Sequence, residues 1–279
     1  MPHPSIALIV STYENPAGLE SCLLGVARQS YPAAQVLVAD DGSGAATRAV
    51  VDRFRAALPL EHVWHPDEGF RLAAIRNRAL AACRADYVVL LDGDTVPHHH
   101  FLRDHAAFAR PGYVVLGQRC ALTGYYGRVL RAEPSTAALV GLFLRGRVLN
   151  DSRAIGTDLR NRFRGLRKGL RIPRAVVRPG TPREAHGGNL GVWHEDARAV
   201  NGFDERFVGW GGEDADFVDR LIRAGRPALY LLFRAVCYHL DHPVNQGNDA
   251  NGRLLRTGTR PPRCARGLDH HRDARSGSG

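Results

Sequence analysis

The feature that most constrains the fold is an apolar run that ends in two aspartates. Tyr87–Leu91 contains only apolar or aromatic residues, and Asp92-Gly93-Asp94 follows it directly. A short apolar run bounded by turn residues is typical of a buried strand. Ligands of open α/β sheets bind beyond the carboxyl ends of the strands, so these carboxylates could hold a divalent cation. A solvated turn would leave the same pattern, and the rest of the chain has to decide between the two.

Strand-like and helix-like segments alternate along the first part of the chain. Short apolar segments predict strands over residues 6–10, 36–39, 62–64, 87–91 and 113–117. Amphipathic segments predict helices over residues 17–29, 45–58, 71–83 and 98–109. A helix over 213–224 and a strand over 228–233 follow later. This alternation predicts an α/β fold with a mostly parallel, Rossmann-like central sheet and helices on both faces.

The 279 residues are enough for one large domain, which we expect over residues 1–245. Residues 125–180 break the alternation and predict a basic helical insertion or flap within it. Residues 246–279 are polar and rich in Arg, Gly and Pro, which predicts a disordered tail.

Positive charge is concentrated in two segments. Residues 145–183 hold 12 Arg or Lys with two acids, and residues 253–279 hold 7 Arg with two acids. Together they carry a formal charge of +15 within a total of +10, so the remaining chain is mildly acidic. Such segments favour anionic partners, among them a phospholipid surface, a phosphorylated glycolipid or nucleic acid. A solvated Arg-rich surface would carry the same charge.

The composition also indicates the cellular compartment in which we expect the protein. No apolar run approaches the 18 or more residues of a membrane-spanning helix. The five cysteines lack metal-site spacing, which favours reduced thiols. We therefore expect a cytoplasmic protein that its basic segments could hold at the inner face of a membrane.

Three further groups of polar residues follow predicted strands or open predicted helices. Tyr13, in the turn after the first strand, could stack on a base, and Asp41, after the second, could accept a hydrogen bond from the N3–H of uracil. Arg71 opens a helix, where it could approach a base or a phosphate. Ordinary turns, a helix cap and a solvated arginine explain each group taken alone equally well.

The segment Trp210-Gly-Gly-Glu-Asp-Ala-Asp216 is more specific. Its glycines would let the backbone approach a ligand, and its carboxylates lie in the first turn of a predicted helix. The helix dipole would keep Asp214 ionised and able to accept a proton. A simple preference for acids at helix N-termini explains the carboxylates but not the Trp-Gly-Gly.

His239 and His242 lie just after the last predicted strand. Either or both imidazoles could join Asp94 at a metal ion. A site with oxygen and nitrogen ligands suits Mn²⁺ or Mg²⁺ bridging a diphosphate.

The order of these motifs over about residues 5–243 resembles family 2 glycosyltransferases of the GT-A fold. The motifs that carry the resemblance are Val10–Asn15, Asp40–Ser43, Arg71–Ala74, Asp92–Asp94, Gly187–Asn189, Asn201–Asp204 and Trp210–Asp214. The last three are similar to the galactosyltransferase-type C-terminal region of β-1,4-galactosyltransferases and chondroitin-polymerase-like enzymes.

The resemblance implies a role for each candidate residue. Uridine would be held by Ser11, Tyr13, Asp41 and Arg71, with Asp92 on the ribose or the donor sugar. The metal would be held by Asp94 and His239, with His242 as the alternative histidine. The sugars would meet Asp214 as the catalytic base, Glu213 beside it and Trp210 as a platform.

The implied reaction is an inverting, metal-dependent transfer from a UDP-sugar to a hydroxyl of a glycan or a lipid-linked or phosphorylated glycolipid. Bacterial polysaccharide or lipopolysaccharide synthesis is the setting that we expect. One alternative is a nucleotidyltransferase, although the chain lacks a Gly-rich basic loop after its first strand. The other is a nucleic-acid-binding protein, which gives no reason for acids at three strand ends and is disfavoured.

Overall fold

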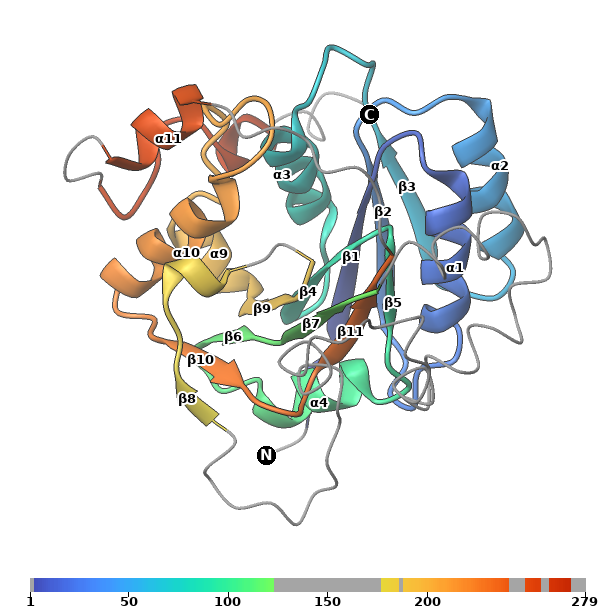
Figure 1. Ribbon diagram of the computed structural model, residues 1–279, viewed down its shortest axis with the longest axis horizontal. Coiled ribbons are helices and arrows are strands. Elements are labelled where there is room, and N and C mark those ends of the chain that lie inside the picture. Colours follow the sequence, from blue (N-terminus) through green and yellow to red (C-terminus); the bar gives the residue numbers. More distant parts are fainter. Residues whose placement is uncertain (1–2, 123–176, 186–187, 241–248, 257–260, 272–279) are drawn as a thin grey trace.

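The computed structural model describes residues 3–122, 177–185, 188–240, 249–256 and 261–271, and it has an α/β fold (Figure 1). Its main sheet has eight strands in the order β3-β2-β1-β4-β9-β6-β10-β8, and a second sheet has the order β5-β11-β7. The strands of the main sheet are β1 (Ile6–Thr12), β2 (Gln35–Asp40), β3 (Leu60–Trp64), β4 (Tyr87–Asp92), β6 (Val114–Leu116), β8 (Val177–Pro179), β9 (Leu190–Trp193) and β10 (Ala228–Leu231). The strands of the second sheet are β5 (Thr95–Pro97), β7 (Gln118–Ala121) and β11 (Val236–His239).

Helices cover both faces of the main sheet. They are α1 (Pro16–Val26), α2 (Ala45–Phe54), α3 (Leu72–Ala82), α4 (Phe101–Phe108), α9 (His194–Ala199), α10 (Glu213–Arg223) and α11 (Asp249–Arg256), with short 3-10 helices η3 (Pro182–Glu184) and η4 (Leu268–His271). In Figure 1, α1 and α2 lie on one side of the strands and α3, α9 and α10 on the other. The predicted α/β class with helices on both faces is therefore confirmed.

The alternation of side chains along β4 explains why one apolar run serves two cores. Val88 and Leu90 pack in a cluster with α3, α9 and α10, whereas Tyr87, Val89 and Leu91 pack in a cluster with α1, α2 and α4. Successive residues of a strand point to opposite faces, so a strand covered on both sides must be apolar throughout. The apolar part of β4 therefore ends inside the fold, and Asp92 and Asp94 follow it there.

The sheet is mostly parallel, as the sequence predicted, but two antiparallel strands change its course. β1 pairs in parallel with β2 and β4, and β2 with β3. β9 lies antiparallel between β4 and β6, and β8 pairs antiparallel with β10 at the edge. The sequence also did not predict the second sheet, in which β11 pairs with β5 and β7.

The expectation of disorder over residues 246–279 is wrong for the parts that the structure describes. Residues 249–256 form α11, and residues 261–271 lie against the domain beside α3 (Figure 1). Leu268 is 1% exposed, and its backbone N–H donates to the carbonyl of Asn201 at 2.9 Å. Cys264 is also buried, and its carbonyl accepts from the Asn201 side chain at 2.9 Å. A few buried apolar residues are enough to hold this polar, Arg-rich stretch against the domain. The average composition of the stretch does not reveal them.

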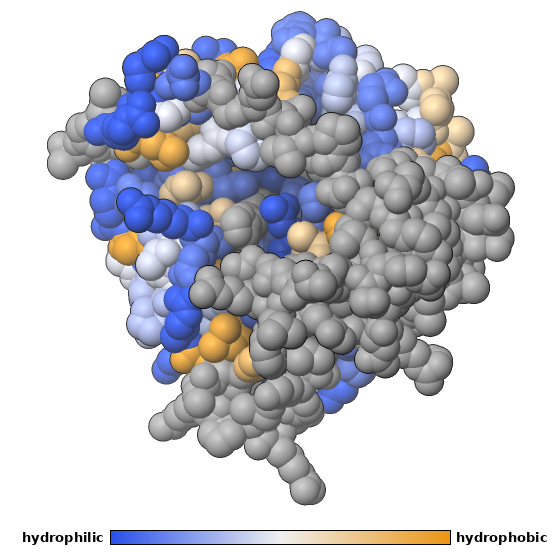
Figure 2. All heavy atoms as spheres, in the orientation of Figure 1, coloured by the Kyte–Doolittle hydropathy of each residue, from blue (hydrophilic) through white to orange (hydrophobic). Residues whose placement is uncertain are grey.

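The predicted insertion over residues 125–180 lies outside the described residues, except for its last four. Three of these form β8, which ends the segment on the edge of the main sheet. Among the described residues, no helix combines the length and the apolarity needed to cross a membrane. All five cysteines are buried and none is paired. On the face shown in Figure 2, the surface around α11 is mostly hydrophilic.

We predict that Leu268→Ala destabilises the whole domain. Truncating a buried leucine removes its transfer free energy and leaves a cavity, which costs about 2–5 kcal/mol. Urea denaturation followed by circular dichroism would measure this loss. Val208→Ala truncates a side chain that is 51% exposed and should stay within about 0.5 kcal/mol of the parent protein. Equal stability of the two variants would show that the C-terminal segment is not part of the cooperative fold.

Candidate active site

The centre of the candidate site is the buried guanidinium of Arg76. It donates to Asp214 Oδ1 at 2.7 Å, to Ser11 Oγ at 3.0 Å and to Asp92 Oδ1 at 3.2 Å. A longer contact of 3.4 Å reaches Glu213 Oε1. Residues from the ends of β1 and β4, from α3 and from the start of α10 thus meet at one cation. Four of the residues predicted from the sequence to act on the donor and the acceptor, namely Ser11, Asp92, Glu213 and Asp214, therefore contact one guanidinium.

The structure explains how an arginine can be 1% exposed in the middle of α3. Its guanidinium carbon lies 5.4 Å from the centre of the Phe203 ring, and its polar atoms face the three carboxylates. Burial lowers the pKa of Arg76, but the nearby carboxylates of Asp214, Asp92 and Glu213 raise it by more than burial lowers it. The net shift of the pKa is therefore upward. The guanidinium therefore remains charged, and its charge holds the site together.

The start of α10 depends on glycine. Gly212 precedes Glu213 with φ +98°, in the left-handed region that favours glycine. A Cβ there would lie 3.0 Å from the Phe207 ring, so that ring would have to move slightly to accept a side chain. This turn places Glu213 and Asp214 in the first helical turn, where the dipole stabilises negative charge. The Trp-Gly-Gly that precedes the acids therefore has a structural reason.

The carboxylates around Arg76 outnumber its single positive charge. Burial and the charge of Asp214 raise the pKa of Glu213 to about 7. Burial raises the pKa of Asp92 as well, and the charges of Asp94 and Asp214 add to the effect although Arg76 opposes it. Glu213 Oε2 is buried and has no hydrogen-bond partner among the described residues. The raised pKa of Glu213 means that this residue holds its proton more tightly than a free glutamate does, and the excess of carboxylates favours the approach of positive charge.

Asp94 and His239 form the candidate metal site. His239 Nε2 lies 3.5 Å from Asp94 Oδ2, and the two side chains are each less than one-fifth exposed. The pairing of β11 with β5 sets this distance, because it places His239 opposite Thr95, and the N–H of Leu240 donates to the Asp94 carbonyl at 2.9 Å. A carboxylate that follows the apolar strand β4 and a neighbouring imidazole from β11 fit a divalent cation of the Mn²⁺ or Mg²⁺ type.

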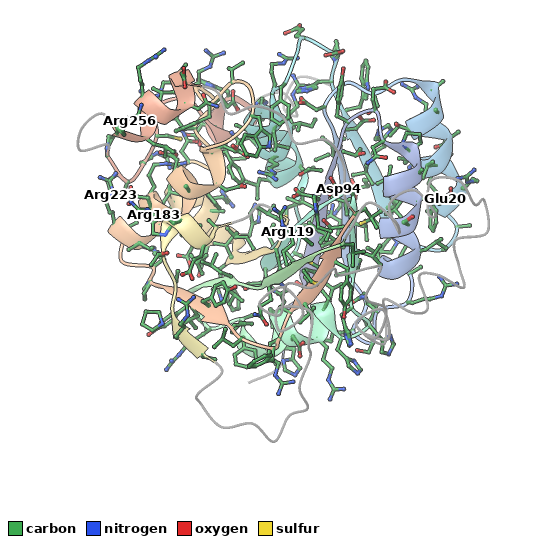
Figure 3. The ribbon with its side chains drawn as sticks, viewed as in Figure 1. Glu20, Asp94, Arg119, Arg183, Arg223 and Arg256 are labelled. Carbon is green, nitrogen blue, oxygen red and sulfur yellow. The ribbon has the colours of Figure 1, made fainter. Side chains whose placement is uncertain are left out.

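The described residues do not bring three His, Cys, Asp or Glu side chains into one metal-binding group. His242, the alternative ligand, lies outside the described residues. Figure 3 shows Asp94 and Arg119 near the middle of the molecule, and Arg119 Nη1 lies 3.6 Å from Asp92 Oδ2. The region thus offers two carboxylates, one imidazole and a neighbouring arginine to a charged ligand.

The residues that were predicted to hold uridine form a second group beside the first. Asp41 is 4% exposed, and its carboxylate is held by His65 Nε2 at 2.6 Å and by the backbone N–H of Arg71 at 2.8 Å. The Tyr13 hydroxyl donates to Asp67 at 2.9 Å, and the Tyr13 ring is 47% exposed. This group joins the Arg76 cluster through the turn after β1, where the Asp41 N–H donates to Thr12 at 3.0 Å.

The side chain of Arg71 has its partners within its own loop. Its guanidinium donates to the Pro66 carbonyl at 2.9 Å and pairs with Glu68 at 2.6 Å. The side chain thus braces its own loop, and the backbone of Arg71 fixes Asp41. Trp210 is 45% exposed, and the neighbouring Gly209 N–H donates to the Phe70 carbonyl at 2.9 Å. The predicted sugar platform is therefore an open surface tied to the loop that holds Asp41.

Sequence reasoning gave no central role to Arg76 and missed Arg119 and the packing role of Asn189. The buried Asn189 side chain donates to two backbone carbonyls and accepts from His105 at 3.0 Å. Beside it, a Cβ on Gly188 would lie 2.5 Å from Asp92 Oδ2. The signal available was the Gly-Gly-Asn motif itself, which lets the chain pass close to the Asp92 carboxylate. An arginine in a helix, by contrast, gives no sign of burial.

Comparison with known proteins agrees with the fold and identifies the family. Residues 7–157 match the family described as "Glycosyl transferase family 2", and residues 177–242 match "N-terminal domain of galactosyltransferase". Similar solved structures include a mannosyltransferase from Pyrobaculum calidifontis in complex with GDP-Man and Mn²⁺, with a TM-score of 0.58, 19% identity and coverage of 94% of this chain and 67% of that one. Another is S. aureus TarS, with a TM-score of 0.57, 19% identity and coverage of 84% and 36%. Fold and site define a GT-A glycosyltransferase domain.

The chain belongs to glycosyl transferase family 2. Its relatives include validoxylamine A glucosyltransferase of Streptomyces hygroscopicus subsp. jinggangensis, 30% identical over 80% of this chain and 53% of that protein. Chondroitin synthase of Escherichia coli is 26% identical over 79% of this chain and 32% of that protein. The chain thus spans about a quarter to a half of the length of such curated relatives.

The raised pKa of Glu213 predicts a pH-dependent penalty on stability. The folded protein holds this proton more tightly than the unfolded chain, so the free energy of unfolding falls as pH rises from about 4.5 to about 7. Glu213→Gln should remove this fall, and the variant should gain up to about 3 kcal/mol over the parent protein between pH 4.5 and pH 7.5. Urea denaturation at several pH values would measure the difference. A constant difference across that range would mean that Glu213 titrates normally.

Proposed function

We propose that the chain transfers a sugar, with inversion, from a UDP-sugar to a hydroxyl of a glycan or glycolipid. The observation that carries the proposal is the Arg76 cluster, in which Asp92 from the Asp-Gly-Asp motif and Asp214 share one guanidinium at 3.2 and 2.7 Å. A donor held at the end of β4 would therefore present its anomeric carbon close to Asp214. That is the position that a base needs in order to deprotonate the attacking hydroxyl.

Each side chain has a defined task in this proposal. Asp214 takes the proton of the acceptor hydroxyl, while Glu213 contacts the acceptor or donor sugar. Arg76 fixes both carboxylates, so the base does not have to be ordered in each cycle. The exposed Trp210 forms the sugar platform, and Ser11, Tyr13, Asp41 and Arg71 position the nucleotide.

Asp94 and His239, with His242 as a further candidate, would hold Mn²⁺ or Mg²⁺. Such a cation, when bound, offsets the negative charge that grows on the leaving diphosphate. The GDP-Man and Mn²⁺ complex of the mannosyltransferase from Pyrobaculum calidifontis, and the complex of S. aureus TarS with UDP, support a nucleotide-sugar donor and a metal. The choice of uridine follows from Asp41, whose carboxylate can accept the N3–H of uracil.

The acceptor and its setting are further parts of the proposal. Relatives named as hyaluronan and chondroitin synthases support a glycan acceptor. The basic segments add attraction to an anionic surface, so we propose an enzyme of bacterial cell-surface polysaccharide or lipopolysaccharide synthesis in the cytoplasm, at the inner face of the membrane. Release of UDP from a panel of UDP-sugars, with GDP-mannose as the counter-example, tests the donor. Turnover of GDP-mannose alone would contradict the assignment of uridine.

Asp214→Asn should lower the rate of transfer by about 10²–10⁴-fold, because the amide cannot take the proton of the acceptor. Binding of UDP in the presence of Mn²⁺ should stay within about threefold of the parent protein, since the diphosphate is held elsewhere. Asp219→Asn is the matched control, because Asp219 lies on the same helix and makes an i,i+4 pair with the exposed Arg223. Coupled assays of UDP release would compare the two variants. Parent-like turnover of Asp214→Asn would remove Asp214 as the base.

Asp94→Ala should weaken the binding of UDP about tenfold or more in the presence of Mn²⁺ and have little effect in its absence. The reason is that the carboxylate acts on the nucleotide through the cation. Isothermal titration calorimetry with and without Mn²⁺ gives both numbers, and the exposed Asp52→Asn serves as a control for charge. Equal weakening in both conditions would assign Asp94 to the fold or to direct contact with the donor.

A further inference from the structure

A pocket of about 520 Å³ lies beside α3 and has a strongly basic lining. Three arginines and three histidines line it, against one carboxylate, that of Glu205. The six basic residues are Arg71, Arg78, Arg266, His65, His270 and His271. They come from the loop before α3, from α3 and from the C-terminal segment, so the segment that looked disordered in sequence provides half of them.

The pocket and the Arg76 cluster lie on different faces of α3. Ala74 and Arg78 line the pocket, and each is two residues from Arg76. At 100° per residue, this spacing places both of them about 160° around the helix axis from Arg76. The pocket therefore opens away from the carboxylates of the catalytic cluster. It approaches the donor region through Arg71 and His65, which both contact Asp41.

The charge of the pocket is not neutralised within the protein. The carboxylate of Glu205 is already committed, because it accepts from His271 Nε2 at 2.5 Å and from Asn77 Nδ2 at 2.9 Å. Arg71 pairs with Glu68. Among the described residues, by contrast, no ion pair joins Arg78 or Arg266 to a carboxylate. Two guanidinium groups thus face the pocket without a counter-charge from that part of the chain.

Two buried nitrogen atoms at the pocket also have no partner. His65 is 1% exposed, and its Nε2 contacts Asp41 at 2.6 Å, whereas its Nδ1 has no hydrogen-bond partner among the described residues. The same is true of the buried Nε of Arg71. Neither atom is open to solvent, so a ligand in the pocket would bind through the guanidinium groups that line it and not through these two atoms.

The walls of the pocket are held in place by backbone hydrogen bonds. The Glu205 N–H donates to the Arg266 carbonyl at 3.0 Å, which fixes the C-terminal segment against the turn before Phe207. The Gly209 N–H donates to the Phe70 carbonyl at 2.9 Å, which fixes the other side. These hydrogen bonds fix the backbone around the pocket, while the Arg78 and Arg266 side chains that line it are exposed.

We propose that this pocket binds the phosphate group of a small phosphate ester, of the size of a phosphorylated sugar. Guanidinium groups bind phosphate through paired, charge-assisted hydrogen bonds. A volume of about 520 Å³ exceeds the needs of one phosphate and lies within the range of small-molecule pockets. The phosphate belongs either to a phosphorylated acceptor, an assignment that rests on the proposed function, or to a free metabolite.

The test uses the whole chain and calorimetric titration with glucose 6-phosphate and with inorganic phosphate, at low ionic strength and without divalent cations. The double variant Arg78→Gln/Arg266→Gln should bind both probes at least about tenfold more weakly than the parent protein. Arg103→Gln removes an exposed arginine from α4, away from the pocket, and should bind like the parent protein. The double variant should also keep its Mn²⁺-dependent affinity for UDP within about twofold.

The outcomes separate this inference from the proposed function. Loss of both phosphate and UDP binding in the double variant would make the pocket part of the donor site. It would overturn the inference that the two sites are separate. Equal binding of the probes by the parent protein and the double variant, or no binding by the parent protein at 10 mM probe (about the weakest affinity of interest), would overturn the site itself. Tighter binding of glucose 6-phosphate than of inorganic phosphate supports a phosphate ester, and the reverse order would overturn that assignment.

Discussion

The buried guanidinium of Arg76 is the interaction on which the candidate site depends. Removing a cation from water is costly, and only partners that are already in place can offset that cost. Asp92, Glu213 and Asp214 supply them from segments more than 100 residues apart in the chain. The guanidinium in turn permits three carboxylates to lie together, which would otherwise repel one another. The guanidinium of Arg76 therefore links α3 to the start of α10 and to the end of β4.

The metal site depends on a different constraint, the pairing of short strands. β5, β7 and β11 contain three or four residues each, yet their register fixes His239 opposite Thr95 and next to Asp94. The strand β4 continues into this second sheet through Gly93, where a Cβ would lie 2.9 Å from the Ser11 carbonyl. The Asp-Gly-Asp motif therefore connects the two sheets. One of its aspartates faces Arg76 and the other faces His239.

The sequence could predict the helices and strands that follow a periodic pattern. It could not predict the features that depend on contacts between segments far apart in the chain. The alternation of apolar runs with amphipathic segments located β1 to β4 and α1 to α3 to within a few residues, because burial on both faces demands such runs. The acids at the strand ends followed from the same logic. Arg76 has the ordinary look of a solvated helical residue, and only α10 makes it a buried hub. Short strands such as β5 carry too few residues for a period, and the docking of Leu268 depends on the turn at Asn201.

Helix α3 connects the catalytic cluster to the basic pocket, and its two faces divide the work between them. Arg76 points to the carboxylates, which balance its charge inside the protein. Arg78 lies two residues further on, and its charge is left for a ligand. Leu268 packs in the same apolar cluster as Ala73 and Ala79 of this helix, so the C-terminal segment that supplies Arg266 is held against it. A ligand that bridges Arg78 and Arg266 would therefore tie that segment to the helix that carries Arg76.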